Sequence, residues 1–339
     1  MAGLFESDIV ATDLQLHEQG DALIKVVNVD TPFTKMVKKG KTQVNKLAAW
    51  GAYFPSEGGD VARAEGSDKT DGFGSNKPVT LKSVVQLNRS QGWMITDLAK
   101  RTGTAHAKSE AQRIAEQKMA DGESFLQMRE RIMLSAQTPI LADDAADGKY
   151  RTTGGFTWLN PTQPGTLFDV PATCRLTAAQ FHSSTLAALT ETVFRNLMAA
   201  TAERINCTAK WTGLVGLTLA RQMSAWAGLV TVTTGLQAVR NMESETLKNV
   251  VTSFKWPEGQ VDIQTHFRLA CDPLTGLKTD YSPRSGLFID PEMWRVAHMQ
   301  PIEHKDGLDQ GGGPRGWWED MFVLQCLQPM GQFAVYVDE

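Results

Sequence analysis

The chain has 339 residues, enough to bury a full hydrophobic core and to form two or three subdomains. Its composition is ordinary for a globular protein, with 42% hydrophobic and 21% charged residues. The net charge of -4 argues against a general binder of nucleic-acid phosphates, which would need a basic face.

Targeting signals and cysteines give little sign of a secreted or membrane protein. The start "MAGLFESDIVATDLQ" lacks the basic beginning and the apolar run of a secretory signal. The most apolar window, Gly213 to Val232, is interrupted by Arg221, Gln222 and Ser224 and is too polar to span a bilayer. The cysteines lie far apart without a CxxC pair, so we expect reduced structural thiols in a cytoplasmic setting. They are Cys174, Cys207, Cys271 and Cys326.

The first hundred residues predict an arm followed by a long hairpin. Residues 1–40 show weak periodicity and a turn at "DTPFTK", which indicates an arm rather than a core element. The aromatic segment "NKLAAWGAYFP" is interpreted as an irregular strand, and "PVTLKSVVQL" as a half-exposed one. In the second strand one face would carry Val79, Leu81, Val85 and Leu87, and the other Thr80, Lys82 and Gln86.

Between these two strands lies an unusually polar stretch, Ser56 to Asn76, with five glycines and seven charged residues. It buries too little apolar surface to order itself, and loops of this length are usually functional or disordered. We therefore expect a two-stranded excursion with a polar tip.

Strong helix formers predict one long helix from Thr104 to about Gln137. Gly122 makes a bend or break in the helix plausible. The predicted core residues of this spine helix, which should face a sheet, are Ile114, Met119, Phe125 and Ile132.

The second half mixes helices and strands without regular alternation, which favours the α+β class. Helical stripes run from Leu186 to Ala200 and from Val215 to Trp226, the second closed by Gly228. Strands are predicted over 229–234, 261–269, 286–290, 318–327 and 332–337. The alternation in 261–269 places His266 on the polar face, exposed to solvent or to an interface.

The chain lacks the common catalytic and nucleotide-binding motifs, so we expect no enzyme and no cofactor. Asp143, Asp144 and Asp147 resemble a metal loop only loosely, and a solvated loop is the better interpretation. Glu303 with His298 and His304 forms a second metal candidate, but the spacing of the histidines fits no helix or strand face. "DQGGGPRG" would cradle an anion or, more simply, connect two strands. Trp317 and Trp318 indicate core or interface positions.

The order of elements resembles the major capsid protein of tailed bacteriophages, with the Hong-Kong-97-type fold. Short motifs are similar to the subgroup of coat proteins like that of phage SU-ten: "DTPF", "AAWGAYFPSEGGD" and "RTTGGFTWL". The segment from Phe288 to Tyr336 resembles the closing pattern of that family, with Glu319 opening a strand. Gln328-Pro329 departs from the Asn-Pro expected there.

The resemblance implies a division of the chain into five parts. These are an N-terminal arm (1–40), an extended loop (41–98), a periphery domain with the spine helix (99–175), an axial domain (176–314) and C-terminal strands returning to the periphery domain (315–339). The resemblance further implies that the extended loop lies over a neighbouring subunit, which agrees with the marginal stability of a single unsupported hairpin in water. Its expected contact residues are Trp50, Tyr53, Phe54, Arg63, Asp68, Lys69 and Asp71.

The implied function is that of a structural subunit, which self-assembles as hexamers and pentamers into the icosahedral head shell around phage DNA. The implied partners are sister subunits, portal and scaffolding proteins, a decoration protein in some phages, and DNA held non-specifically at the inner face. No membrane is implied; the protein would reside in the virion after assembly in the host cytoplasm. The alternatives are an encapsulin-like compartment shell and a soluble enzyme with an unrecognised site.

Overall fold

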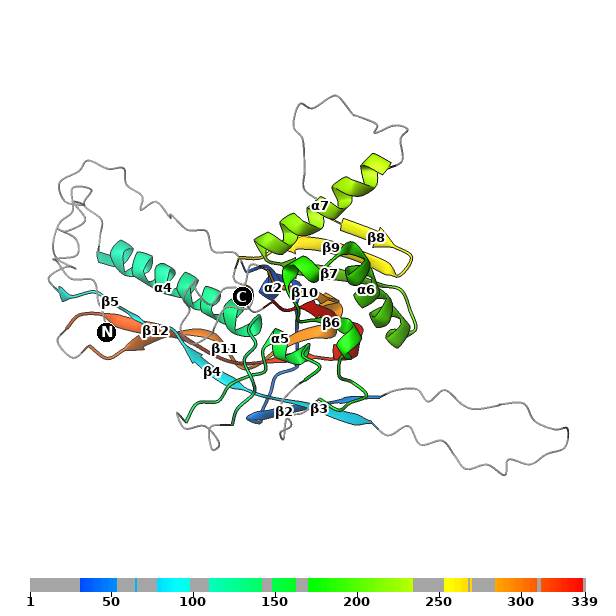
Figure 1. Cartoon of the computed structure of the whole chain (residues 1–339). Helices are drawn as coiled ribbons and strands as arrows, with labels where there is room; N and C mark the ends of the chain where they lie inside the picture. Colours follow the sequence, from blue (N-terminus) through cyan, green and yellow to red (C-terminus); the bar gives the residue numbers. More distant parts are fainter. Residues whose placement is uncertain are drawn as a thin grey trace.

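The structure, a computed structural model, describes residues 31–53, 65, 78–97, 110–141, 148–162, 170–233, 253–267, 269, 284–309 and 312–337. Within these ranges the chain forms two sheets, a separate two-stranded hairpin and three longer helices (Figure 1). Helices and strands are mixed along the chain, as the α+β prediction requires.

The first sheet carries the longest helix. Its strand order is β1-β11-β12-β4, and β5 also pairs with β12. The bounds are β1 Lys38–Lys39, β4 Gln86–Arg89, β5 Trp93–Met94, β11 Trp294–Gly307 and β12 Arg315–Cys326. The helix α4, Glu110–Met133, lies along this sheet and contacts β12 (Figure 1). It matches the predicted spine helix.

The second sheet has the order β6-β13-β10-β7-β9-β8 and packs against two helices. Its strands are β6 Phe181–His182, β7 Ala209–Val215, β8 Ser253–Trp256, β9 Gly259–Thr265, β10 Gly286–Ile289 and β13 Phe333–Val335. The helices are α6, Glu191–Ile205, and α7, Leu217–Thr233. Phe194 of α6 lies against Phe288 and Phe333, and these buried rings fix the helix on the sheet.

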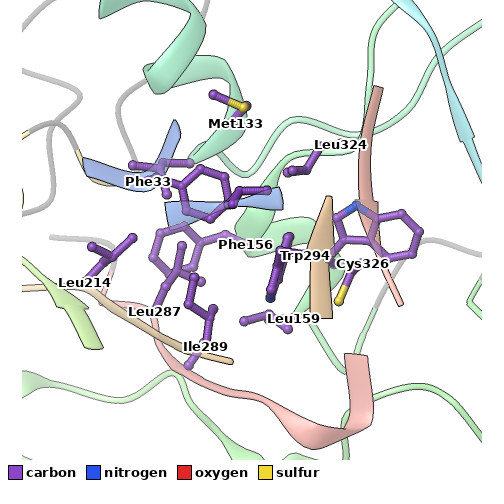
Figure 2. Packing of buried hydrophobic residues seen from close by; sticks show 14 of the residues in the cluster. Phe33, Met133, Phe156, Leu159, Leu214, Leu287, Ile289, Trp294, Leu324 and Cys326 are labelled. Carbon is purple, nitrogen blue, oxygen red and sulfur yellow. The ribbon is translucent and has the colours of Figure 1, made fainter. Parts of the chain in front are cut away.

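A hydrophobic cluster joins the two sheets (Figure 2). It includes Phe33 of the short helix α2, Pro32–Met36, and Phe156 of α5, Gly155–Trp158. Leu287 comes from the second sheet, and Trp294 and Leu324 come from the first. Because one cluster draws on both sheets, they form a continuous core. Short 3-10 turns complete the chain: η2 Ala178–Gln180, η3 Leu186–Ala188, η5 Pro291–Met293 and η6 Pro329–Gly331.

The hairpin is a sheet of its own, made of β2, Leu47–Ala52, and β3, Val79–Val84. Its antiparallel register runs from Leu47 opposite Val84 to Ala52 opposite Val79. The two strands extend from the side of the molecule, below the first sheet in Figure 1. The polar stretch predicted at the tip lies outside the described residues, apart from Glu65.

Residues 32–39 correct the expectation that the first forty residues stay outside the core. Phe33 is fully buried against Trp294, with ring centroids 5.8 Å apart. β1 then adds to the edge of β11 as a parallel strand. The weak periodicity hid this role because the segment is anchored by one aromatic ring and two strand residues. Residues 1–30 lie outside the described part of the chain.

The single strand predicted over 78–87 is two strands in different sheets. Ser83, Val84 and Val85 are all buried where the chain passes from β3 to β4. This passage interrupts the alternation, so Leu87, predicted on the buried face, is 46% exposed. The buried Ser83 hydroxyl has a hydrogen-bonding partner there, because it lies 2.9 Å from the Thr153 hydroxyl.

The boundaries of α7 differ from the prediction at both ends. Val215 belongs to β7, and the helix continues through Gly228 to Thr233, where a strand was predicted over 229–234. A glycine inside a helix costs only about 1 kcal/mol against alanine, so it does not by itself end one. Similarly, Leu186 and Leu189 precede α6, which begins after the N-cap Thr190. None of the helices in the described ranges has the length and apolarity needed to cross a bilayer.

Candidate functional site

The root of the hairpin carries both expected contact residues that the structure describes, Trp50 and Tyr53. The Trp50 indole packs at a tilt against Trp158, with centroids 5.6 Å apart, and its Nε1 donates to the Cys326 carbonyl at 3.2 Å. Tyr53 is 67% exposed. Trp50 therefore ties the hairpin to its own subunit, and Tyr53 is available to another molecule. The remaining five, Phe54, Arg63, Asp68, Lys69 and Asp71, lie outside the described residues.

An open groove of about 770 Å³ runs between this root and the body of the subunit. We call it the hairpin groove. Its walls come from β2, the end of α6, the start of β11 and the segment after β12. Three of its described lining residues are cations, Lys41, Arg204 and Arg295, and none is an aspartate or glutamate. Met293 and Met330 add apolar surface to that of Trp50.

Three of the four predicted core residues of α4 lie on the side that faces the sheet, and one does not. Phe125 and Ile132 are buried, and Ile114 packs half-buried against Trp93 and Ile95. Met119, however, is 63% exposed, so its assignment to the helix core is wrong.

Helix geometry explains this error. The sheet-facing stripe follows positions 114, 118, 122, 125, 129 and 132, at the spacing of three and four residues that one helix face requires. Lys118, Gly122 and Arg129 occupy half of it, and Met119 is about 100° away from Lys118. The Trp318 indole donates to the Lys118 carbonyl at 3.0 Å and lies 3.1 Å from where a Gly122 side chain would begin. The glycine thus admits the tryptophan, and the helix continues through it.

A buried polar cluster links α4 to the sheet through Arg129. Its Nε lies 3.0 Å from Asp320 Oδ2, but the two groups are not aligned as a hydrogen bond, so the contact is an ion pair. Asn88 donates to the other Asp320 oxygen at 2.9 Å, and Arg129 Nη2 lies 3.1 Å from His298 Nε2. Burial, opposed by Arg129 and Asn88, raises the pKa of Asp320 to about 6. Burial, helped by Arg129, lowers the pKa of His298 to about 4.

The next residue of α4, Glu130, is a fully buried carboxylate that binds two other segments. It accepts hydrogen bonds from the backbone N–H groups of Phe33 and Thr34, at 2.7 and 3.0 Å. His266 Nε2 lies 3.2 Å from the same carboxylate. The prediction that His266 faces solvent or an interface is therefore wrong, because β9 ends at Thr265 and the alternation does not continue. Phe267 is the exposed residue there.

The remaining metal candidates have structural partners of their own. His304 stacks on Trp93, whose Nε1 donates to His304 Nε2 at 2.9 Å. Burial and Lys118 lower the pKa of His304. Irregularities in the β11–β12 pairing lie between His298 and Glu303, and Glu303 accepts a hydrogen bond from Gln300. No three His, Cys, Asp or Glu side chains in the described part of the chain are placed to share a metal ion. Asp143, Asp144 and Asp147 lie outside it.

Glu319, on the sheet face away from α4, holds three strands together. Lys305 of β11 and Arg89 of β4 contact its two carboxylate oxygens at 2.6 and 2.8 Å. The hydrogen bond from Lys305 is the main reason that the pKa of Glu319 is lowered. Trp317 covers Arg89, whose guanidinium carbon lies 5.3 Å from the ring centroid. The contacts across this sheet are thus ionic on one face and buried polar on the other.

Comparison with known proteins identifies the family. The model of a family described as SU10 major capsid protein matches residues 9–331. The chain belongs to this family. No curated protein matches it.

Solved phage capsids share the fold at low sequence identity. The capsid protein of cyanophage A-1(L) is 10% identical with a TM-score of 0.62, covering 96% of this chain and 98% of that one. That of cyanophage P-SCSP1u is 13% identical with a TM-score of 0.57, covering 96% and 94%. That of cyanophage Pam1 is 11% identical with a TM-score of 0.56, covering 95% and 96%. These likenesses agree with the Hong-Kong-97-type fold.

The protein is therefore a phage major capsid protein, a structural subunit of the head shell and a component of the virion, and not an enzyme. As a member of the SU10 major capsid family it assembles with copies of itself. The compartment-shell alternative is not favoured.

The sequence pointed to the family but not to the buried polar residues that join its segments. Glu130 and Arg129 were missed, because isolated polar residues in a helix give no periodic signal of burial. The hairpin groove was missed for a different reason: its walls come from four segments far apart in the sequence.

Proposed function

We propose that this capsid subunit forms hexamers and pentamers of an icosahedral head that packages DNA, assembled in the host cytoplasm, and that its hairpin lies over a neighbouring subunit. Portal and scaffolding proteins would be its other partners, and DNA would contact the inner face non-specifically. The observation that carries the contact proposal is the hairpin itself. It is a two-stranded sheet apart from both larger sheets, with an exposed tyrosine at the end of its paired region.

A two-stranded hairpin gains little stability alone, and support from a neighbour would supply what the subunit's own core does not. Within one subunit, Trp50 fixes the root of the hairpin. The strands beyond it would pair with or lie on the next copy, and many weak contacts repeated around a closed shell sum to a stable assembly.

We also propose the five-part division of the chain as its assembly layout. The first sheet, which includes β4 and β5 from the loop range and β11 from the axial range, would form the periphery domain with α4. The second sheet, which includes β13 from the C-terminal range, would form most of the axial domain with α6 and α7. In this layout Tyr53, together with Phe54, Arg63, Asp68, Lys69 and Asp71 farther out, would contact the neighbouring subunit.

The experiment is to replace residues 53–78 by Asn-Gly. Because Ala52 and Val79 are the last paired residues, they would then flank a two-residue turn, which suits Asn-Gly. Thermal melting of the unassembled subunit should shift little, since a shorter loop costs less entropy. Negative-stain microscopy should show no closed shells.

Two outcomes would contradict the proposal. Normal closed shells would mean that the hairpin is a passive surface loop. An unfolded variant would mean that the replaced residues belong to the subunit's own core.

A further inference from the structure

The side chains of Trp93 and His304 share a hydrogen bond that only a neutral histidine can make. Trp93 of β5 donates from its Nε1 to Nε2 of His304, on β11, at 2.9 Å, and the centroids of the two rings lie 5.9 Å apart. An indole N–H donates but cannot accept. His304 Nε2 must therefore carry a lone pair, which places the proton of the neutral imidazole on Nδ1.

Charged groups face His304 from β11 itself and from α4. Asp306 Oδ1, on β11, lies 3.5 Å from His304 Nδ1 and 3.2 Å from Lys118 Nζ of α4. Asp121 of α4 accepts a hydrogen bond from Ser90 Oγ at 2.6 Å. Burial and Lys118 lower the pKa of His304, and the two aspartates oppose them.

The imidazole is enclosed by uncharged groups from β5 and β12, so it cannot simply turn away from Trp93. Trp318 of β12 lies edge-on to it, with ring centroids 5.1 Å apart. On the same strand, a Cβ added to Gly316 would lie only 2.9 Å from His304 Nε2. A second proton on the imidazole would therefore bring two N–H donors against each other, with no acceptor between them.

Of the two strands that carry these rings, β5 is the more weakly held. It pairs with β12 at two positions, where Trp93 lies opposite Gly316 and the next residue lies opposite Arg315. By contrast, β11 has 14 residues and pairs with β12 over most of its length. Trp93 and Ile95 also pack against Ile114 of α4, so a displacement of Trp93 would loosen the start of that helix.

We propose that the Trp93–His304 pair is a proton-sensitive latch, which holds β5 and the first turns of α4 on the first sheet at neutral pH and releases them in acid. Because the native pKa of His304 is lowered from its ordinary 6.5, the unfolded state binds the proton more readily. The stability that the latch contributes is therefore present above pH 6.5 and is lost as the pH falls toward the lowered value. The latch does not rest on the proposed function, since all its contacts lie within one subunit.

The first test measures the proton affinity of His304. If protonation weakens the bond from Trp93, that bond must oppose protonation to the same extent. Full-length, unassembled subunits with isotope-labelled histidine are titrated by NMR, and the His304 signal is assigned by its loss in His304→Gln. Trp93→Phe keeps an aromatic ring but removes the donor, so it should raise the titration midpoint of His304 by about 1 pH unit, a tenfold gain in proton affinity. Trp226→Phe, in the core cluster of the second sheet, is the matched control and should leave the midpoint unchanged.

Hydrogen exchange followed by mass spectrometry tests the release itself. After correction for the intrinsic pH dependence of exchange, protection of the amides in β5 and in residues 110–118 should fall by about tenfold or more between pH 7.5 and 5 in the wild type. In His304→Gln the side-chain oxygen can still accept from Trp93 but cannot be protonated, so this protection should persist. Residues 125–133, at the other end of α4, should behave alike in both proteins.

Three results would overturn the latch. The first is wild-type protection of β5 and residues 110–118 that is the same at both pH values. The second is an equal loss of protection in His304→Gln, which would place the sensitive group elsewhere. The third is a His304 midpoint that Trp93→Phe leaves where it is in the wild type.

Discussion

Asp320 and His298 contact the same arginine, and burial changes their protonation in opposite directions. The native pKa of Asp320 is raised to about 6 from an ordinary 3.8, so the native state holds an extra proton between these values. The native pKa of His298 is lowered to about 4 from 6.5, so there the unfolded state holds the extra proton. Between about pH 4 and 6 the two effects on the unfolding free energy oppose one another.

Removing either partner should expose the pH dependence of the other. In Asp320→Asn the histidine remains, the unfolded state binds more protons, and stability should rise with pH from 4 to 6. In His298→Gln the aspartate remains, the native state binds more protons, and stability should fall over the same range. Each change should be about 2 kcal/mol relative to the wild type. Urea unfolding of unassembled subunits at pH 4, 5 and 6 measures these changes in the free energy of unfolding. If the free energy of unfolding varies with pH in the same way in the wild type and both variants, the two opposing effects are refuted.

The contacts of Glu130 predict that its replacement lowers the stability of the subunit. Glu130→Ala would remove the carboxylate that accepts from the buried N–H group of Phe33 and the partly buried N–H group of Thr34 and that contacts the His266 ring. The free energy of unfolding should fall by about 3–5 kcal/mol. Glu203→Ala, on an exposed position of α6, should change it by less than about 0.5 kcal/mol. Denaturant unfolding measures both; equal effects would show that the contacts of Glu130 contribute little.

At the scale of elements, α4 depends on a stripe that mixes apolar and polar side chains. Phe125 and Ile132 are buried in it, and Lys118, Gly122 and Arg129 complete it through indole, packing and ion-pair contacts. The amphipathic pattern predicted the helix, because its residues are strong helix formers. It placed Ile114, Phe125 and Ile132 on the correct face but also Met119, because three positions of the contact stripe are not hydrophobic and the pattern could not mark them.

The helix therefore allows a matched comparison along its length. Phe125→Ala should lower the free energy of unfolding by about 3–5 kcal/mol, the usual cost of truncating a buried aromatic ring. Met119→Ala, at a 63% exposed position, should cost less than about 0.5 kcal/mol. Chemical denaturation of the two unassembled variants measures both losses of stability. Similar losses would mean that Met119 is buried after all in the subunit in solution.

At the scale of the whole molecule, the order of the helices and strands was predictable from the sequence. The pairing and packing between them were not. The hairpin, the long helix and the late strands each carry a local pattern that a single segment can show. By contrast, Phe33, Trp294 and Leu324 meet in one cluster from segments distant in the sequence. The exchange of sheets at Ser83–Val85 is likewise fixed by what packs on both sides. Pairing and packing partners are non-local, and a single sequence does not encode them as a period.

Two neighbouring aromatic residues of the hairpin, Trp50 and Tyr53, should differ in their effects on subunit stability and on shell assembly. Trp50→Ala removes a ring packed on Trp158 and a hydrogen bond to Cys326, so the unassembled subunit should lose about 2–3 kcal/mol of stability. Tyr53→Ala removes a 67% exposed side chain, so the melting temperature should stay within about 2 °C of the wild type. If Tyr53 contacts a neighbour, however, that contact is lost in every copy, and the yield of shells in light scattering should fall markedly. Wild-type shell yield from a Tyr53→Ala subunit would remove this residue from the interface.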